Sequence, residues 1–257
     1  MMNLDKDELM MRKRLLDQAN TAYSRGINIF SDFLNPNEQN IFTSLKNELP
    51  KIKYFTYGGF SDAERRILCF CGNDSSLTQD DVTFPIFCIK VVPLNRKYSD
   101  SFNHRDFLGA VLNLGLDRGK IGDILINENE GYIFAHTTIS NFITEQLIKV
   151  KHTLVQASVI EQQEFDYKPK FVEIVGTVAS VRLDSILSVA FHSSRSSLTG
   201  LIEGGKVFVG GKLVESNSYT LKENDVVSVR GLGKFMFGGT SYQTKKGKYS
   251  VKIFMYS

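Results

Sequence analysis

The sequence predicts an α+β fold of three domains, which span residues 1–80, 81–162 and 171–257. Three observations lead to this prediction. Helical periodicity precedes strand-like runs in the first span, strand and helix patterns alternate in the second, and two short helical patterns accompany strand-like runs in the third. The chain has 257 residues, of which 42% are hydrophobic and 23% charged, as expected for a soluble globular protein.

The first domain is expected to be an α/β arrangement. Its predicted elements are helical sequence over residues 1–50, with a loop at 32–36 before a second helix at 38–49, and then strands at 52–57 and 66–71. Gly26 interrupts the first helical pattern, and Pro50 ends the second helix. The polar stretch 73–81 marks the expected boundary with the next domain.

The central domain shows the succession βαββαβ. Its predicted elements are a strand at 85–92, a helix at 104–114, strands at 121–126 and 132–136, a helix at 139–150 and a strand at 153–160. This order is typical of a ferredoxin-like split unit, which the RRM fold also uses. A polar linker, residues 161–170, follows.

The third domain is expected to consist of two short helices and a small sheet. The helical stripes are formed by Leu183, Ile186, Leu187 and Ala190, and by Leu198, Leu201 and Ile202. Gly204-Gly205 ends the second helix, and Gly210-Gly211 is a turn between strand-like runs. From residue 171 onward the chain has 11 Lys and Arg against 6 Asp and Glu, so the positive charge is concentrated here.

The motifs RLDSIL, SRSSLTGLIEGGKVFVGGKLV and DVVSVRGLGKF together resemble the S4-like RNA-binding domain, which contains the αL motif. Two positions differ from the common pattern: Gly210-Gly211 replaces Asn-Gly, and Ser197 stands where a basic residue often follows Ser-Arg-Ser. The resemblance implies RNA contact through a cationic face formed by the two helices and the hairpin. The candidate RNA-binding residues are Arg182, Ser194, Arg195, Ser197, Lys206, Lys212, Arg230 and Lys234.

The resemblance extends beyond this domain. The segments YGGFSDAERR, HRDFLGAVLNLGLDRGKIGDILI and TKKGKYSVKIFMY are similar to the bacterial YlmH family of S4-like-domain proteins. Members of that family are associated with ribosomes and implicated in the rescue of stalled large subunits that carry peptidyl-tRNA. They have a looser association with a cell-division gene cluster. The resemblance therefore implies ribosome-associated quality control as the setting.

The central domain contains candidate residues for a second RNA contact. Tyr132 and Phe134 are two residues apart on a predicted strand, so both side chains point to one face, as in an RRM platform on which bases stack. Core packing is the alternative for both rings. Arg105, Arg118 and Lys120 are candidate phosphate contacts, although Arg105 and Asp106 also fit an ordinary helix start.

The sequence gives no convincing catalytic or metal-binding cluster. His104-Arg105-Asp106 matches a kinase triplet without the accompanying motifs, and His192 beside Ser193 has no orienting acid. The three cysteines, Cys69, Cys71 and Cys88, are expected to be free thiols, because a zinc site needs four suitable ligands. We therefore expect no cofactor and no metal.

The expected function is non-enzymatic binding to structured RNA, either rRNA or tRNA, on the large ribosomal subunit. The N-terminus is too charged for a secretory signal, so a cytoplasmic protein is expected, with no membrane contact and no small-molecule substrate. We expect a monomer. Two alternatives stay open: an RNA-modifying enzyme of the pseudouridine synthase type, and a cell-division scaffold protein.

Overall fold

The computed structural model describes residues 6–72, 76–127, 129–161, 164–165, 167, 171–245 and 247–256. The chain forms two compact units, Met1–Tyr167 and Lys168–Ser257. Helices and three sheets together confirm the predicted α+β class. The predicted boundary at residues 80–81 falls inside the first unit and stays a prediction. The predicted linker 161–170 lies largely outside the described residues.

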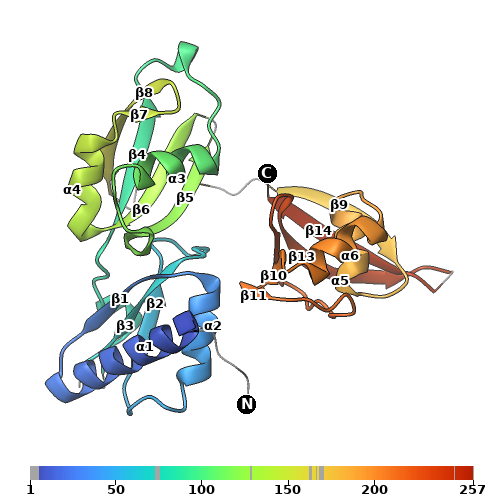
Figure 1. The fold of residues 1–257 in the computed structure, drawn as a ribbon, viewed down its shortest axis with the longest axis horizontal. Helices are drawn as coiled ribbons and strands as arrows, with labels where there is room; N and C mark the ends of the chain where they lie inside the picture. Colours follow the sequence, from blue (N-terminus) through green and yellow to red (C-terminus); the bar gives the residue numbers. More distant parts are fainter. Residues whose placement is uncertain are drawn as a thin grey trace. The chain divides into compact units, whose positions relative to one another are not determined.

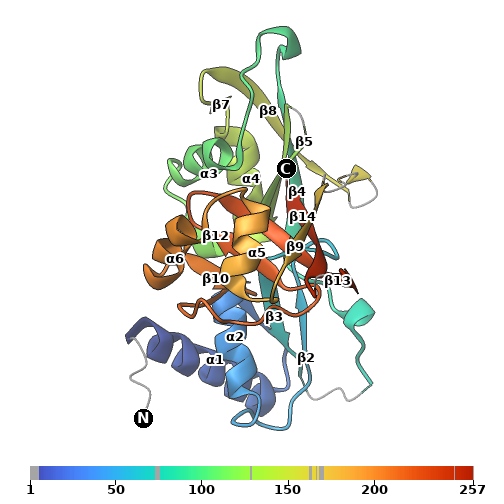
Figure 2. The ribbon, with the colours of Figure 1, turned by 90° about the vertical axis from the view of Figure 1, so that its right-hand side faces the viewer.

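In the first unit, a three-stranded antiparallel sheet of order β1-β3-β2 packs against two helices that lie side by side (Figures 1 and 2). The elements are α1 (Lys6–Arg25), β1 (Ile29–Leu34), α2 (Pro36–Leu45), β2 (Tyr54–Tyr57) and β3 (Arg66–Phe70). A capping box starts α2: the Asn35 side chain accepts the Glu38 N–H at 3.0 Å, and the Glu38 carboxylate accepts the Asn35 N–H at 2.6 Å.

The loop predicted at 32–36 is wrong over its first three residues, because strand β1 continues to Leu34. The polar pair Ser31-Asp32 hides the strand pattern in the sequence. In the structure the Ser31 hydroxyl accepts the Leu68 N–H at 2.9 Å, and the Asp32 carboxylate pairs with Lys120 and Arg14. Because these polar groups have partners, burial of the strand leaves them satisfied.

The middle sheet has the antiparallel order β5-β6-β4-β8-β7. Its elements are η1 (Gln79–Asp81), β4 (Ile86–Pro93), η2 (Arg96–Tyr98), α3 (His104–Leu112), η3 (Arg118–Lys120), β5 (Ile121–Asn127), β6 (Glu130–His136), α4 (Thr137–Gln146), β7 (Lys149–Val150) and β8 (Thr153–Ile160). The predicted βαββαβ succession is confirmed, and the order of the four long strands is that of a split βαβ unit. Helix α4 ends before residue 150, because Lys149 and Val150 pair with β8.

The two faces of the middle sheet have different partners. Helices α3 and α4 pack on one face, around Ile89, Val91 and Ile133. The opposite face, which we call the covered face, carries Cys88, Tyr132 and Phe134, and these residues pack against Phe33 and Ile67 of the first sheet. The first unit therefore buries both faces of this sheet.

The second unit contains a six-stranded antiparallel sheet of order β11-β10-β12-β13-β14-β9. Its elements are β9 (Phe171–Val178), α5 (Leu183–Ala190), α6 (Arg195–Glu203), β10 (Val207–Val209), β11 (Lys212–Leu213), β12 (Val226–Val229), β13 (Gly233–Gln243) and β14 (Tyr249–Tyr256). Both predicted helices and the hairpin turn are confirmed, with φ of 55° at Gly210 and 77° at Gly211, as a type I′ turn requires. Leu187, Leu198, Val227, Phe235 and Ile253 belong to the core between helices and sheet.

Candidate nucleic-acid interface

The amino terminus of α6 places an exposed arginine at the start of a helix. The Ser194 hydroxyl accepts the Ser197 N–H at 3.3 Å, and the Ser197 hydroxyl donates to the Ser194 carbonyl at 2.7 Å, so both serines serve the cap. Arg195 is the first helical residue, and none of the ion pairs found in the described part of the chain includes it. A helix amino terminus favours anions, so this arginine is well placed to contact phosphate.

Arg182, at the start of α5, is engaged within the protein. Its Nε lies 3.3 Å from the Asp184 carboxylate, which also accepts the Ser185 N–H at 2.8 Å. The Arg182 side chain keeps 45% of its surface exposed. Because a guanidinium has five N–H donors, Arg182 can bind a phosphate only through those that Asp184 does not engage.

The hairpin adds further lysines near the helices. Lys212 pairs with Val209, whose side chain is in the helix–sheet core, so Lys212 lies on the helix side of the sheet edge. Lys206 is exposed just before β10. Arg182, Arg195 and Lys212 therefore all lie on the helix side of the sheet.

Arg230 and Lys234 are not part of that helix-side group. Side chains alternate along a strand, and Phe235 and Phe237 of β13 face the helices, so Lys234 points to the opposite face. The Arg230 guanidinium lies over the ring of Phe208, at 4.8 Å from the centroid, and Phe208 also faces away from the core. The structure thus divides the predicted cationic residues between two faces.

Two of the cations predicted for a second contact are engaged inside the first unit. Arg118 donates to the carbonyls of Ile121 and Gly122, and burial together with the nearby Arg65 cation lowers the pKa of Arg118 to about 10. The Lys120 ammonium lies 2.6 Å from the Asp32 carboxylate. The Lys120–Asp32 pair joins β1 of the first sheet to the segment that precedes β5, whereas the Arg118 contacts stay within that segment and β5.

Arg65 reinforces the same junction. Its guanidinium donates to the carbonyls of Phe33 at 2.9 Å and Ile121 at 3.0 Å, while the Asp123 carboxylate accepts its backbone N–H at 3.0 Å. Burial lowers the pKa of Arg65, against the attraction of nearby carboxylates. Neither spacing nor periodicity in the sequence indicates that these arginines bind backbone carbonyls.

The predicted aromatic platform is buried. Tyr132 is 4% exposed and Phe134 2% exposed, and the ring centroids of Phe60 and Phe165 lie 5.0 and 5.2 Å from that of Phe134. At Gly59, an added Cβ would lie only 2.2 Å from the Phe134 ring. In this arrangement the rings pack as core side chains, and a base would have to displace their neighbours to stack on them.

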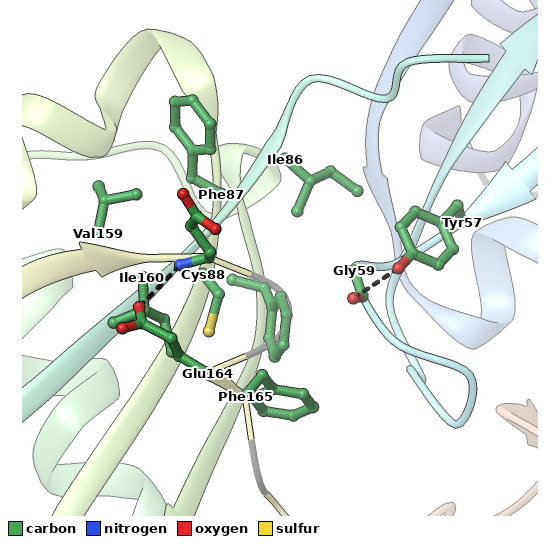
Figure 3. A pocket seen from close by; sticks show the side chains of 11 residues that line it. Tyr57, Gly59, Ile86, Phe87, Cys88, Val159, Ile160, Glu164 and Phe165 are labelled. Carbon is green, nitrogen blue, oxygen red and sulfur yellow. Dashed lines mark hydrogen bonds between the residues drawn. The ribbon is translucent and has the colours of Figure 1, made fainter. Parts of the chain in front are cut away.

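A pocket of about 350 Å³ opens beside the covered face, lined in part by Phe87, Cys88 and Phe165 (Figure 3). Glu161 and Glu164 also line it, and the Glu164 carboxylate accepts the Glu161 N–H at 3.1 Å. Carboxylates repel phosphate, so this pocket does not suit an RNA backbone.

Arg105, the remaining cation of the predicted second contact, is exposed on α3 and lines a shallow groove. Lys149 and Lys151 line the same groove, and Lys151 lies 3.1 Å from the Asp106 carboxylate. Sequence reasoning missed these two lysines, although the spacing Lys149-Val150-Lys151 was a usable signal.

The remaining predictions about chemistry concern helix starts, thiols and metals. Asn103 and Asp106 form a capping box, which supports the helix-start interpretation of His104-Arg105-Asp106. Cys69, Cys71 and Cys88 are free and buried. Over the part of the chain that the structure describes, no group of three or more His, Cys, Asp or Glu residues is placed to hold a metal ion. Among the described helices, none has the length and apolar character needed to cross a membrane.

Comparison with known proteins gives matches along most of the chain. Residues 9–74 match the YlmH N-terminal family, residues 80–166 the RNA-binding domain in YlmH, and residues 181–227 the S4 domain. "Ribosome-associated protein quality control protein P2" of Bacillus subtilis (strain 168) is 31% identical over 226 residues, or 86% of this chain and 84% of the relative. The solved "Cell division protein ylmH from Streptococcus pneumoniae" covers 65% of this chain and 99% of its own, with a TM-score of 0.52 and 16% identity, which is a likeness of fold alone.

Proposed function

Because the chain belongs to the YlmH family, we propose that it is a non-enzymatic protein of ribosome-associated quality control that docks on structured rRNA or tRNA. The partner is the large ribosomal subunit carrying peptidyl-tRNA, and the protein acts as a monomer in the cytoplasm. The name of the Bacillus subtilis relative supports this setting.

The observation that carries the proposal is the exposed Arg195 at the amino terminus of α6, within the residues that match the S4 domain. The helix N–H groups and the guanidinium form an anion site for a phosphate of folded RNA. Arg182 and Lys212, on the same side of the sheet, add charge around it. Contacts of this kind position the protein by phosphate and shape, with limited reading of bases.

The central domain is the second contact of the proposal. Of the residues predicted there, Arg105 is exposed and lines the groove shared with Lys149 and Lys151. Two weak contacts on one chain raise each other's effective concentration, so modest patches suffice for stable docking.

Binding to purified large subunits bearing tRNA, measured across a series of salt concentrations, tests the proposal. Affinity should fall steeply as salt rises, and Arg195→Glu should weaken binding about tenfold or more and reduce the salt slope by about one. The affinity of Arg195→Lys should fall between those of the unaltered protein and Arg195→Glu, because lysine keeps the charge but cannot bind bidentately. Lys245→Glu makes the same charge change at another exposed site of the unit and should have a small effect.

A flat salt dependence, or equal losses for Arg195→Glu and Lys245→Glu, would contradict docking through α6. Analysis of ribosomal RNA and tRNA after incubation with the protein tests the enzyme alternative. Any modified nucleotide formed with turnover would overturn the non-enzymatic role.

A further inference from the structure

The second unit carries a row of side chains across the sheet face opposite α5 and α6. Cross-strand pairing joins Phe208 of β10 to Ser228 of β12, Ser228 to Lys234 of β13, and Tyr256 of β14 to Phe171 of β9. The Lys234 ammonium lies 4.7 Å from the centroid of the Tyr256 ring. This contact continues the row from β13 to β14. The row crosses five strands, or about 19 Å at the usual strand spacing.

This surface, which we call the open face, keeps its rings accessible. Phe171 is 42% exposed, and Phe208, Phe254 and Tyr256 are each partly exposed. The Phe171 ring lies edge-on to Tyr256 and Phe254, with centroids 4.9 and 6.3 Å apart. Core residues of the same strands face the helices, so the open face is separate from the α6 site.

Gly238 shows how closely one of these rings lies on the sheet. A Cβ added there would come 2.5 Å from the Phe254 ring, so the absence of a side chain lets the ring lie over β13. Phe254 therefore lies close against the sheet, while the Phe171 ring stands edge-on to it.

The charges on the open face favour an anionic partner. Arg230 lies over Phe208 and Lys234 over Tyr256, so each of these cations is held against a ring. Lys252 lies 3.6 Å from Glu173, and both are about half exposed. With one carboxylate against three cations, this set of residues carries a net positive charge.

We propose that the open face binds an unpaired segment of RNA, whose bases stack on the aromatic rings while Arg230 and Lys234 neutralise phosphates. Exposed rings together with cations on an accessible surface are the features by which single strands are bound without sequence preference. The inference rests on the proposed function in taking RNA as the partner, and it goes beyond it in assigning a second face and unpaired nucleotides. Phe171, Arg230, Lys234 and Tyr256 all lie outside the residues that match the S4 domain.

A protein partner is the main rival, because partly exposed aromatic residues also serve protein interfaces. The presence of Arg230 and Lys234 on the same face as the exposed Phe171 ring favours nucleic acid, since a base and its phosphate require a ring and a cation close together. Charge depletion at the centre of a protein interface is the usual pattern, and Lys234 is at the centre of this row.

Fluorescence anisotropy of a short labelled oligouridylate, titrated with the full chain, tests the proposal. The double variant Phe171→Ala/Tyr256→Ala should weaken binding about tenfold or more, because loss of a stacking ring is costly for each base. Tyr256→Phe keeps the ring and should bind as the unaltered protein does. Tyr242→Ala removes a ring that is 65% exposed farther along β13 and is the matched control.

Photocrosslinking gives a measurement that does not depend on a variant. Oligouridylate containing 4-thiouridine, irradiated with the unaltered full chain, should crosslink to peptides of β13, β14 and β9. Crosslinks confined to α5 and α6, or an unchanged affinity in the double variant, would overturn the proposal. Loss of ribosome binding in the double variant without loss of oligouridylate binding would also overturn it, in favour of a protein contact.

The two proposals fail separately. Arg195→Glu should weaken binding to the large subunit and leave oligouridylate binding nearly unchanged, apart from a small general charge effect. If Arg195→Glu has no effect on the subunit while the double variant loses the oligouridylate, the α6 site is wrong and the open face stands. If instead Arg195→Glu weakens binding to the subunit while the double variant still binds the oligouridylate, RNA binding by the open face is wrong and the proposed function stands.

Discussion

The middle sheet and the C-terminal sheet carry the same aromatic pattern with opposite outcomes. Tyr132 and Phe134 on β6, like Phe254 and Tyr256 on β14, occupy alternate positions and face away from the helices of their sheet. The first pair is 4% and 2% exposed, whereas both rings of the second are partly exposed. An aromatic pair on a strand is therefore accessible to a base only where no other element packs over it.

The largest expected difference between the faces is the reactivity of a thiol. Cys88 is on the covered face, and burial raises its pKa from 9.0 to about 12. At about pH 8 this lowers the thiolate fraction about a thousandfold, so alkylation by iodoacetamide should be slower by a similar factor than for an ordinary thiol. Mass spectrometry of tryptic peptides over time measures the rate.

Val175→Cys supplies the matched thiol on the open face, where Val175 is 60% exposed. In this variant one cysteine should react quickly, while Cys69, whose pKa burial also raises to about 12, and Cys88 react only once urea unfolds the chain. Comparable rates for residues 88 and 175 would mean that the covered face opens readily in solution.

Removal of one ring from each face should separate their contributions to stability. Phe134→Ala should lower the free energy of unfolding by about 4 kcal/mol, because the cavity forms among buried side chains. Tyr256→Ala should lower it by only about 1 kcal/mol, since that ring is already partly hydrated. Urea denaturation measures both, and equal losses would mean that the open face is covered in the folded protein.

A methyl group added under a ring sharpens the same contrast. A Cβ at Gly122 would lie 2.7 Å from the buried Phe33 ring, and one at Gly238 would lie 2.5 Å from the Phe254 ring. Gly122→Ala should cost about 2 kcal/mol, because Phe33 has no room to move. Gly238→Ala should cost less than about 1 kcal/mol, because Phe254 can swing toward solvent. Similar thermal unfolding shifts for the two variants would contradict this.

Much of the fold could be predicted from the sequence, because periodicity is a local property. The stripe from Leu183 to Ala190, the Gly210-Gly211 turn and the βαββαβ succession each depend on neighbouring residues and were found where expected. Strand β1 could not be predicted, because the hydrogen bond that makes buried Ser31 acceptable comes from Leu68, far away in the sequence.

The candidate sites were less predictable, because they depend on which other elements pack against each face of a sheet. Strand alternation shows that Tyr132 and Phe134 share a face, but nothing in it shows that Phe33 and Phe60 lie against that face. The place of Lys234 could have been found: Phe235 and Phe237 form the apolar side of their strand, so alternation alone puts Lys234 opposite the helices.

The smallest expected effect concerns the ion pairs that Asp32 of β1 forms with Lys120 and Arg14. Burial by itself would raise the pKa of Asp32, but hydrogen bonds from Lys120 and Arg14 and the attraction of both cations outweigh it and lower the pKa below 3.8. Because the folded pKa is the lower one, the stability that Asp32 contributes is present above about pH 4 and is lost as the pH falls through the folded value.

Asp32→Asn should therefore lower the free energy of unfolding by about 1 kcal/mol at neutral pH and by progressively less in acid. Glu173→Gln is the matched variant on the open face, where the pair with Lys252 is about half exposed at 3.6 Å and should contribute nothing measurable. Urea denaturation of both variants at a series of pH values checks this. A loss for Asp32→Asn that is independent of pH would show that its hydrogen-bond geometry, rather than its charge, stabilises the junction.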